Sequence, residues 1–196
     1  MRTDLLMSVQ GISVSFWEEK RRLQALKDVS FNIPKSKTVC LVGESGCGKT
    51  TLFSMCIGEQ NSEGGKIYLN NKAIDQIPIH LRSNEGLGYL PQQRSVFNLS
   101  TYDNIFGICQ LYFKDLAKQK AVTEKLLDEF NLQHLRSLNA SVLSGGEIRR
   151  LMMARVMITS PKIVLLLSLI HISEPTRLRR ISYGLLGVKK KIGGGG

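Results

Sequence analysis

The first part of the chain alternates between apolar and polar residues at the spacing of β-strands. Residues 8–16 and 28–33 show this pattern, and the charged stretch 18–22 between them predicts a turn. Residues 38–42 form a continuous apolar run of strand length, which is typical of a strand buried on both faces. These segments therefore predict three strands near the start of the chain.

A short helical segment and further strands follow. The helical segment spans 49–57. The strand-like stretches 66–69 and 72–74 flank Asn70-Asn71, a pair that favours a two-residue hairpin turn. Residues 88–90 predict a short strand that the following proline ends.

From about residue 100 to residue 159 the apolar period becomes helical. Apolar residues recur at helical spacing among Glu and Lys in 114–130, and 144–158 predicts another helix. Residues 162–166 return to a buried strand. Strands, a helical segment and a returning strand predict an α/β core that carries a helical subdomain at about 93–160.

The chain changes character at residue 167. Leu167 to Arg177 has the sequence L-S-L-I-H-I-S-E-P-T-R, which resembles the translation of a transposase adapter used in sequencing libraries. The lysines 189–191 and the glycines 193–196 resemble translated homopolymers. We therefore interpret 167–196 as a tail of non-biological origin and exclude it from the fold prediction. The alternative is a divergent basic tail.

The net charge limits the partners that the chain would have. It is +11 at pH 7, and the six basic residues and one acidic residue in 167–196 account for +5, which leaves +6 for the rest. A mildly basic body suits a small anionic ligand or a surface next to a membrane. It gives only weak support for nucleic acid as a partner.

The cysteines and the longest apolar run indicate the compartment. Cys40, Cys47, Cys56 and Cys109 have no metal-ligand spacing, and no signal peptide precedes them, so we expect reduced, mostly buried thiols in the cytoplasm. The longest apolar run, 163–172, is shorter than the roughly 20 residues of a membrane-spanning helix. We therefore expect any membrane role to come through a partner.

A glycine-rich loop separates the strand at 38–42 from the helix at 49–57. Its sequence G-E-S-G-C-G-K-T fits the phosphate-binding pattern G-x-x-x-x-G-K-[ST] in the required context of strand, loop and helix. Glycines let backbone N–H groups converge on phosphate oxygens, and the helix N-terminus adds about half a positive charge. The Lys49 ammonium would reach the β- and γ-phosphates, and the Thr50 hydroxyl would bind Mg²⁺. The candidate binding residues of this loop are Gly43, Glu44, Ser45, Gly46, Cys47, Gly48, Lys49, Thr50 and Thr51.

A second glycine pair begins the helix at 144–158. Ser144 and Glu147 in L-S-G-G-E have the spacing of a capping box. Gly145 and Gly146 leave the helix start bare, so its free N–H groups can meet an anion. The alternative is a capped helix without a ligand, but such a helix does not need two glycines. The pattern therefore favours a second anion-binding helix start.

With these two motifs the chain resembles the ATPases of ABC transporters. L-S-G-G-E resembles their signature motif, and Pro91-Gln92 resembles their Q-loop, with Gln92 the matching glutamine. Phe16, with Trp17 as the alternative, stands where the family has an aromatic residue that stacks on adenine. The resemblance covers 8–166. It implies a P-loop NTPase fold, namely an α/β ABC ATPase core with an antiparallel β subdomain and a helical insert, whose C-terminal part is missing.

The resemblance also implies ligands, partners and location. The expected ligands are ATP and Mg²⁺, with Thr50 and Gln92 at the metal. Two ATPase subunits are expected to face head to tail as a homodimer. Ser144, Gly145 and Gly146 of one subunit would then cover the ATP that is bound to the phosphate loop of the other. The homodimer is expected to dock on transmembrane permease subunits at the inner face of the cytoplasmic membrane, without nucleic acid.

The residues for hydrolysis are not where the family would have them. The family places an aspartate for Mg²⁺ and a glutamate for the attacking water directly after an apolar strand, but Leu167 and Ser168 follow 163–166. Glu174 comes too late, and His171 does not match the family's switch histidine, so we assign no catalytic residue. We expect the parent protein to hydrolyse ATP and this chain not to. We also expect missing neighbours to leave the phosphate-loop strand with an unpaired edge.

Within the family, two stretches are most similar to the lipopolysaccharide-export ATPases. They are Gly86–Ile105, around the Q-loop, and Glu129–Arg136. The ATPases of branched-chain amino-acid importers are the neighbouring alternative. A soluble ABC ATPase that acts on DNA or ribosomes is a third hypothesis, but the coiled-coil inserts or tandem halves usual in that class are not visible.

Overall fold

The computed structural model describes residues 4–18, 21–44, 46–167 and 184–190. The chain divides into two compact units. The first consists of Met1–Tyr89 and Lys162–Gly196, and the second consists of Leu90–Pro161. In the described part of the chain, no helix is long and apolar enough to cross a membrane.

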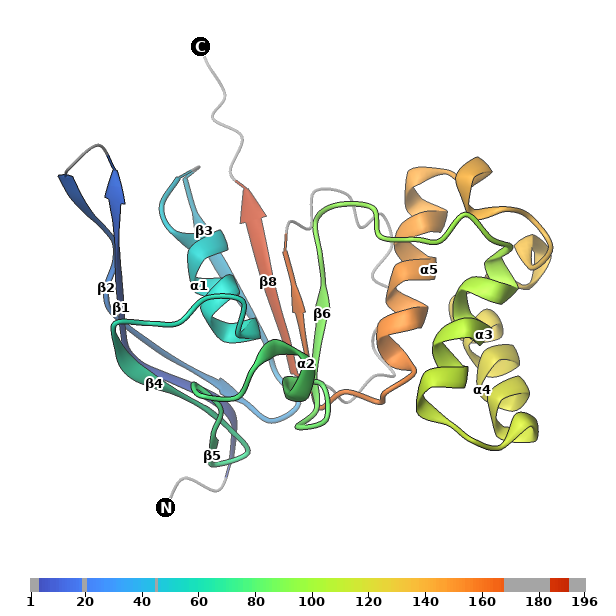
Figure 1. Cartoon of the computed structure of the whole chain (residues 1–196), viewed down its shortest axis with the longest axis horizontal. Helices are drawn as coiled ribbons and strands as arrows, with labels where there is room; N and C mark the ends of the chain where they lie inside the picture. The colour runs from blue at the N-terminus through green and yellow to red at the C-terminus, as the bar shows by residue number, and fades with distance from the viewer. Residues whose placement is uncertain (1–3, 19–20, 45, 168–183, 191–196) are drawn as a thin grey trace, which may run out of the picture. The chain divides into compact units, whose positions relative to one another are not determined.

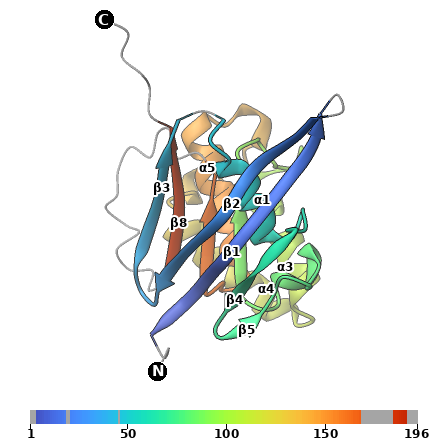
Figure 2. The ribbon, with the colours of Figure 1, turned by 90° about the vertical axis from the view of Figure 1, so that its left-hand side faces the viewer.

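The first unit contains an antiparallel sheet with the strand order β2-β1-β4-β5 (Figure 2). β1 spans Leu5–Glu18 and β2 spans Arg21–Pro34, so both are longer than the apolar alternation predicted. The predicted turn is correspondingly too wide, because Trp17 pairs with Arg22 across the two strands. Pairing between β1 and β2 therefore extends both strands into the charged segment that the sequence analysis had interpreted as a turn.

The predicted hairpin joins β4 (Gly64–Leu69) to β5 (Lys72–Ala73). Leu69 pairs with Lys72, which leaves a two-residue loop. Asn70 and Asn71 both adopt left-handed backbone conformations, with φ values of 48° and 64°. A type I′ turn requires this conformation at both positions, and asparagine tolerates it better than most residues. The hairpin prediction is therefore confirmed.

A second sheet of the first unit has the strand order β3-β8-β7-β6. It is built from β3 (Thr38–Gly43), β6 (Leu87–Leu90), β7 (Ile163–Leu166) and β8 (Gly184–Lys190). β8 runs parallel to both β3 and β7 and pairs with each of them. The sequence analysis assigned no structure to this segment. β3 is the last strand of this sheet among the described residues, so the expected unpaired edge is present on one side of β3, while β8 pairs with its other side.

β3 is not buried on both faces, which corrects a second expectation. Val39 and Leu41 pack against the core, but Thr38, Cys40 and Val42 are exposed, the last at 63%. The alternation shows that only one face of β3 is covered in the described part of the chain. An apolar run shows that a strand is hydrophobic, but it does not show whether other elements pack on both of its faces.

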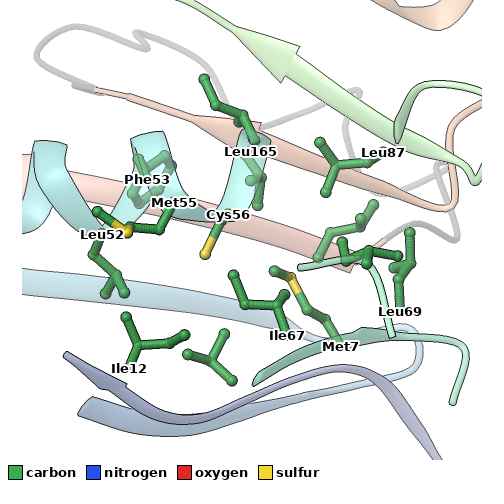
Figure 3. Close-up of a cluster of buried hydrophobic side chains, with 14 of the residues drawn as sticks. Met7, Ile12, Leu52, Phe53, Met55, Cys56, Ile67, Leu69, Leu87 and Leu165 are labelled. Atoms are coloured by element: carbon green, nitrogen blue, oxygen red, sulfur yellow. The ribbon is translucent and has the colours of Figure 1, made fainter. Parts of the chain in front are cut away.

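The helix α1 (Lys49–Ile57) lies between the two sheets of the first unit (Figure 1), with the bounds that the sequence predicted. Its side chains meet residues of both sheets (Figure 3). Burying side chains of this size contributes about 1.5–3 kcal/mol each, so the core fixes the helix in place. The labelled side chains of Figure 3 include Leu52, Phe53, Met55 and Cys56 of α1, Met7 and Ile12 of β1, Ile67 of β4 and Leu165 of β7.

The second unit is built mainly from three helices that pack on one another. They are α3 (Thr101–Tyr112), α4 (Leu116–Glu129) and α5 (Gly145–Met157). Each begins after a polar residue whose side chain accepts a hydrogen bond from the first turn, and Asp115 does so for α4. This cap explains why α4 begins slightly later than the apolar period predicted. The short helix α2 (Ile79–Arg82) belongs to the first unit.

Candidate nucleotide-binding site

The phosphate-binding loop connects β3 to the start of α1. Gly48 caps the helix with φ of 85°. A Cβ atom at Gly48 would lie 2.9 Å from the carbonyl oxygen of Ala25 and 2.8 Å from a methyl carbon of Leu26, both in β2. Glycine is therefore required here by the backbone conformation and by the close approach of a strand. Gly46 also has a left-handed φ, of 82°.

The Lys49 side chain folds back over this loop. Its ammonium group donates to the carbonyl oxygen of Gly43 at 2.8 Å and to that of Glu44, and lies 3.1 Å from the sulfur of Cys47. The positive charge is thus held close to the loop backbone that would surround a phosphate. A phosphate oxygen would take over some of these hydrogen bonds, and the charge would reinforce the amides of the helix start.

The other residues of the loop are placed as follows. Thr50 is exposed and Thr51 half-buried in the first turn of α1. Glu44 and Cys47 are exposed. Cys40 is exposed as well, so the expectation of mostly buried cysteines is wrong for two of the four, and only Cys56 and Cys109 are buried. Ser45 lies outside the described residues. The role of Thr50 as a metal ligand stays a prediction.

The two aromatic candidates for stacking on adenine differ in their exposure. Phe16 is 38% exposed and Trp17 is 78% exposed. The pairing of β1 with β2 shifts in register between Val14 and Ser15, so the burial of Val14 does not extend to either aromatic residue. Phe16 remains the candidate that the sequence predicts, with Trp17 as the alternative.

The second motif starts α5 in the other unit. Ser144 caps the helix and forms the predicted capping box with Glu147. The backbone N–H of Ser144 donates to the Glu147 carboxylate at 2.7 Å, and the Ser144 hydroxyl accepts from the Glu147 N–H at 3.4 Å. Hydrogen bonds from the hydroxyl and backbone of Ser144 hold the pKa of Glu147 below its ordinary value.

The two glycines of this motif are not explained by the packing of their own unit. Both are exposed, and neither has a positive φ. A Cβ on Gly146 would meet nothing within 4 Å among the described residues, and one on Gly145 would lie 3.9 Å from the Arg94 guanidinium. What the glycines provide is open space in front of the first N–H groups of α5. That space suits a ligand that approaches the helix start closely.

Gln92 is exposed in the segment between β6 and α3, and an arginine holds this segment on α5. The guanidinium of Arg155 donates to the carbonyl oxygen of Ser95 and lies 4.5 Å from the centre of the Phe97 ring. Sequence reasoning gave no role to Arg155 or to Arg94. An arginine in a loop or on a polar helix face carries no pattern that distinguishes it from a solvated charge.

The predicted site residues thus fall into two groups. Phe16 and 43–51 belong to the first unit, and Gln92 and 144–147 belong to the second. In the first group the start of α1 carries the phosphate loop, and in the second the start of α5 carries the glycine pair.

The one described residue directly after β7 is Leu167, which carries no carboxylate. Leu167 is 8% exposed and belongs to the hydrophobic core of the first unit. Ser168, His171 and Glu174 lie outside the described residues. The phosphate-binding loop therefore fits a nucleotide, whereas the described donors for Mg²⁺, chiefly the Thr50 hydroxyl, lack the acidic residue that this cation prefers.

The capping box gives a prediction with a defined pH dependence. The Ser144→Ala variant should lose about 1 kcal/mol of stability at pH 7. Because the folded pKa of Glu147 is depressed, the hydrogen bonds to its carboxylate contribute fully above the unfolded value of about 4.3 and are lost as the pH falls through the folded value. The deficit should therefore shrink between pH 7 and pH 3, as measured by urea unfolding.

The matched control for this prediction is Ser141→Ala, which removes an exposed serine hydroxyl shortly before the cap. It should change the unfolding midpoint little at either pH. A Ser144→Ala deficit of the same size at pH 7 and pH 3 would contradict the ionised capping box.

Comparison with known protein families agrees with this geometry. A family model described as ABC transporter matches residues 26–166. The lipopolysaccharide export system ATP-binding protein LptB of Haemophilus influenzae is 35% identical over 164 residues, which cover 82% of this chain and 66% of that protein. LptB of Escherichia coli K12 is 38% identical over 145 residues, which cover 73% and 60%. The chain thus spans between about three fifths and two thirds of the length of these relatives.

Solved structures show the same fold. CbiO1 from Clostridium perfringens, described as part of the ABC transporter complex cbiONQ, superposes with a TM-score of 0.82 at 20% identity over 96% of this chain and 79% of that chain. The ATP-binding cassette MJ0796, in a dimeric post-hydrolysis state bound to ADP and Pi, superposes with a TM-score of 0.79 at 18% identity over 94% and 88%. With the phosphate loop, the signature helix and the family match together, the chain belongs to the ABC transporter family as an ATP-binding protein.

Proposed function

We propose that this chain binds ATP as the nucleotide-binding subunit of an ABC transporter, and that its parent protein hydrolyses ATP to drive lipopolysaccharide export. The observation that carries the proposal is the phosphate loop. Its glycine cap is pressed against β2, and the Lys49 ammonium is held over its backbone. A phosphate would replace the carbonyl groups that now accept from the Lys49 ammonium, so the positive charge is already close to the position that the anion would take.

The chemistry assigned to the loop is electrostatic. Backbone amides at the start of α1 and the Lys49 ammonium neutralise the charge of the β- and γ-phosphates, and Phe16 stacks on the base. The chemistry that Mg²⁺ would supply at this site is neutralisation of the negative charge on the phosphates. In this chain Thr50 would contribute a hydroxyl and Gln92 a side-chain oxygen to that ion.

The open start of α5 supports a homodimer as the second part of the proposal. Gly145 and Gly146 leave free N–H groups facing outward, and Ser144 lies beside them. A second copy of the chain would place the triphosphate on its phosphate loop against this helix start, and the first copy would do the same in return. We propose that the dimer docks on permease subunits at the inner face of the cytoplasmic membrane. The Q-loop segment around Gln92 would transmit closure of the dimer to these subunits.

The chain as it stands is proposed to bind ATP without turning it over. The position after β7 that the family uses for the magnesium aspartate holds a buried leucine, Leu167. Losing a general base alone lowers a rate by about 10²- to 10⁴-fold, and the metal ligand is lost as well. We also propose that residues 167–196 do not belong to the parent protein. In this chain, residues 184–190 form a strand that pairs with β3.

The sequence of the parent gene and its activity in cells test the proposed export role. The gene should encode Asp-Glu at 167–168, and its full-length product should restore growth to a strain depleted of its lipopolysaccharide-export ATPase. Rescue of branched-chain amino-acid uptake instead would favour the importer alternative. A gene that encodes Leu-Ser at 167–168 would contradict the proposal for the tail.

Nucleotide binding tests the loop directly. The chain should bind a fluorescent ATP analogue saturably, and Lys49→Ala should weaken this binding at least tenfold, since a charge-assisted contact to phosphate is worth about 1.5–3 kcal/mol. EDTA should change the affinity little, and no phosphate should be released. The Lys37→Ala variant removes an exposed lysine of the same unit and should bind normally.

Two results would overturn the proposal. A chain that fails to bind ATP saturably would contradict the assignment of the loop. Magnesium-dependent release of phosphate that disappears in Lys49→Ala would contradict the assignment of the chain as inactive.

A further inference from the structure

A buried arginine lies at the end of α1 opposite the phosphate loop. Arg82 is only 1% exposed, although arginine is among the residues least often buried. One terminal nitrogen donates to the carbonyl oxygens of Met55 at 2.9 Å and Cys56 at 2.7 Å. Nε donates to the carbonyl of Ile77 at 2.6 Å, and the other terminal nitrogen donates to that of Asp75 at 3.1 Å.

Two of these carbonyls belong to the last turn of α1. The last four carbonyl groups of a helix have no partner within it, and together they form its negative end. Arg82 donates to the carbonyls of Met55 and Cys56 with a full positive charge, and the Met55 carbonyl also accepts from the backbone N–H of Gly58 at 3.2 Å. Arg82 therefore caps α1 by hydrogen bonding and by charge, at a depth where water cannot replace it.

The chain beyond α1 is shaped to admit this side chain. Gly58 ends the helix with φ of 83°. A Cβ at Gly58 would lie 2.5 Å from Nε of Arg82. A side chain there would displace the guanidinium, so the glycine is required both for the turn and for the approach of Arg82.

The remaining contacts tie α1 to the segment that leads into β6. Asp75 and Ile77 precede α2, which carries Arg82, and their carbonyls fix the guanidinium from the other side. The Asp75 carboxyl also attracts the guanidinium, and its Oδ1 is buried without a hydrogen-bond partner among the described residues. Burial lowers the pKa of Arg82, and the Asp75 carboxyl opposes this shift.

We propose that Arg82 is a positioning residue for the nucleotide site. By fixing the C-terminal end of α1, it holds the direction of the helix, and with it the N–H groups and the Lys49 ammonium at the other end. The nine residues of α1 span roughly 13 Å at 1.5 Å per residue, so Arg82 acts on phosphate only through the helix. The inference rests on the proposed binding of ATP.

The proposal differs from a purely structural role in what it predicts for different nucleotides. If Arg82 only stabilised the fold, its loss would reduce the folded fraction and weaken every nucleotide equally. If it positions α1, its loss weakens binding through the β- and γ-phosphates and leaves binding through the base largely unchanged. The ratio of the AMP and ATP dissociation constants within one variant separates the two roles, because it does not depend on the folded fraction.

The test uses Arg82→Lys and Arg82→Met in the full chain. Lysine keeps the charge but cannot direct several N–H groups to separate carbonyls as the planar fork of arginine does. Dissociation constants for ATP and AMP would be measured by competition with a fluorescent analogue. We expect ATP affinity to fall about tenfold in Arg82→Lys, equivalent to about 1.4 kcal/mol, while AMP affinity changes less than twofold.

Arg136→Lys is the matched control. Arg136 is exposed, pairs with Glu124 and belongs to the other unit, so its replacement should leave the AMP-to-ATP ratio unchanged. If Arg82→Met does not fold, the AMP-to-ATP ratio of Arg82→Lys alone tests the role of Arg82. An unchanged ratio in Arg82→Lys, or equal weakening of ATP and AMP, overturns the role of Arg82. A wild-type chain that does not bind ATP overturns the proposed function instead.

Discussion

The proposed binding of phosphate depends on the fixed direction of one short helix. α1 is held at three places: its first turn is pressed against β2 at Gly48, its middle is buried between two sheets, and its last carbonyls are capped by Arg82. Backbone amides attract an anion effectively only when they do not have to reorganise. The core of the first unit therefore serves the site as much as it serves stability.

The start of α5 is also held in a fixed conformation, but by other residues. There the capping box of Ser144 and Glu147 holds the first turn, and two glycines keep the space in front of it open. Arg155 fixes the segment after Gln92 on the same helix. Each unit thus carries one helix whose N-terminus is suited to bind an anion. One helix N-terminus contacts only one side of a triphosphate, and the proposed dimer would supply a second helix N-terminus for the other side.

Local patterns were sufficient to predict α1, the Asn70-Asn71 hairpin and the capped start of α5, because each depends on residues close in sequence. Tertiary features were not predictable in this way. Arg82 resembles a surface charge in the sequence, and only the fold shows that it is buried among carbonyl groups. The exposed face of β3 and its pairing with 184–190 likewise depend on distant neighbours.

Amide hydrogen exchange with and without ATP, followed by mass spectrometry, tests the central claim most directly. The account predicts that ATP slows exchange at the N–H groups of residues 46–51, because those groups would donate to phosphate oxygens. Unchanged exchange in this segment at saturating ATP, or slowing confined to segments away from the start of α1, would contradict it.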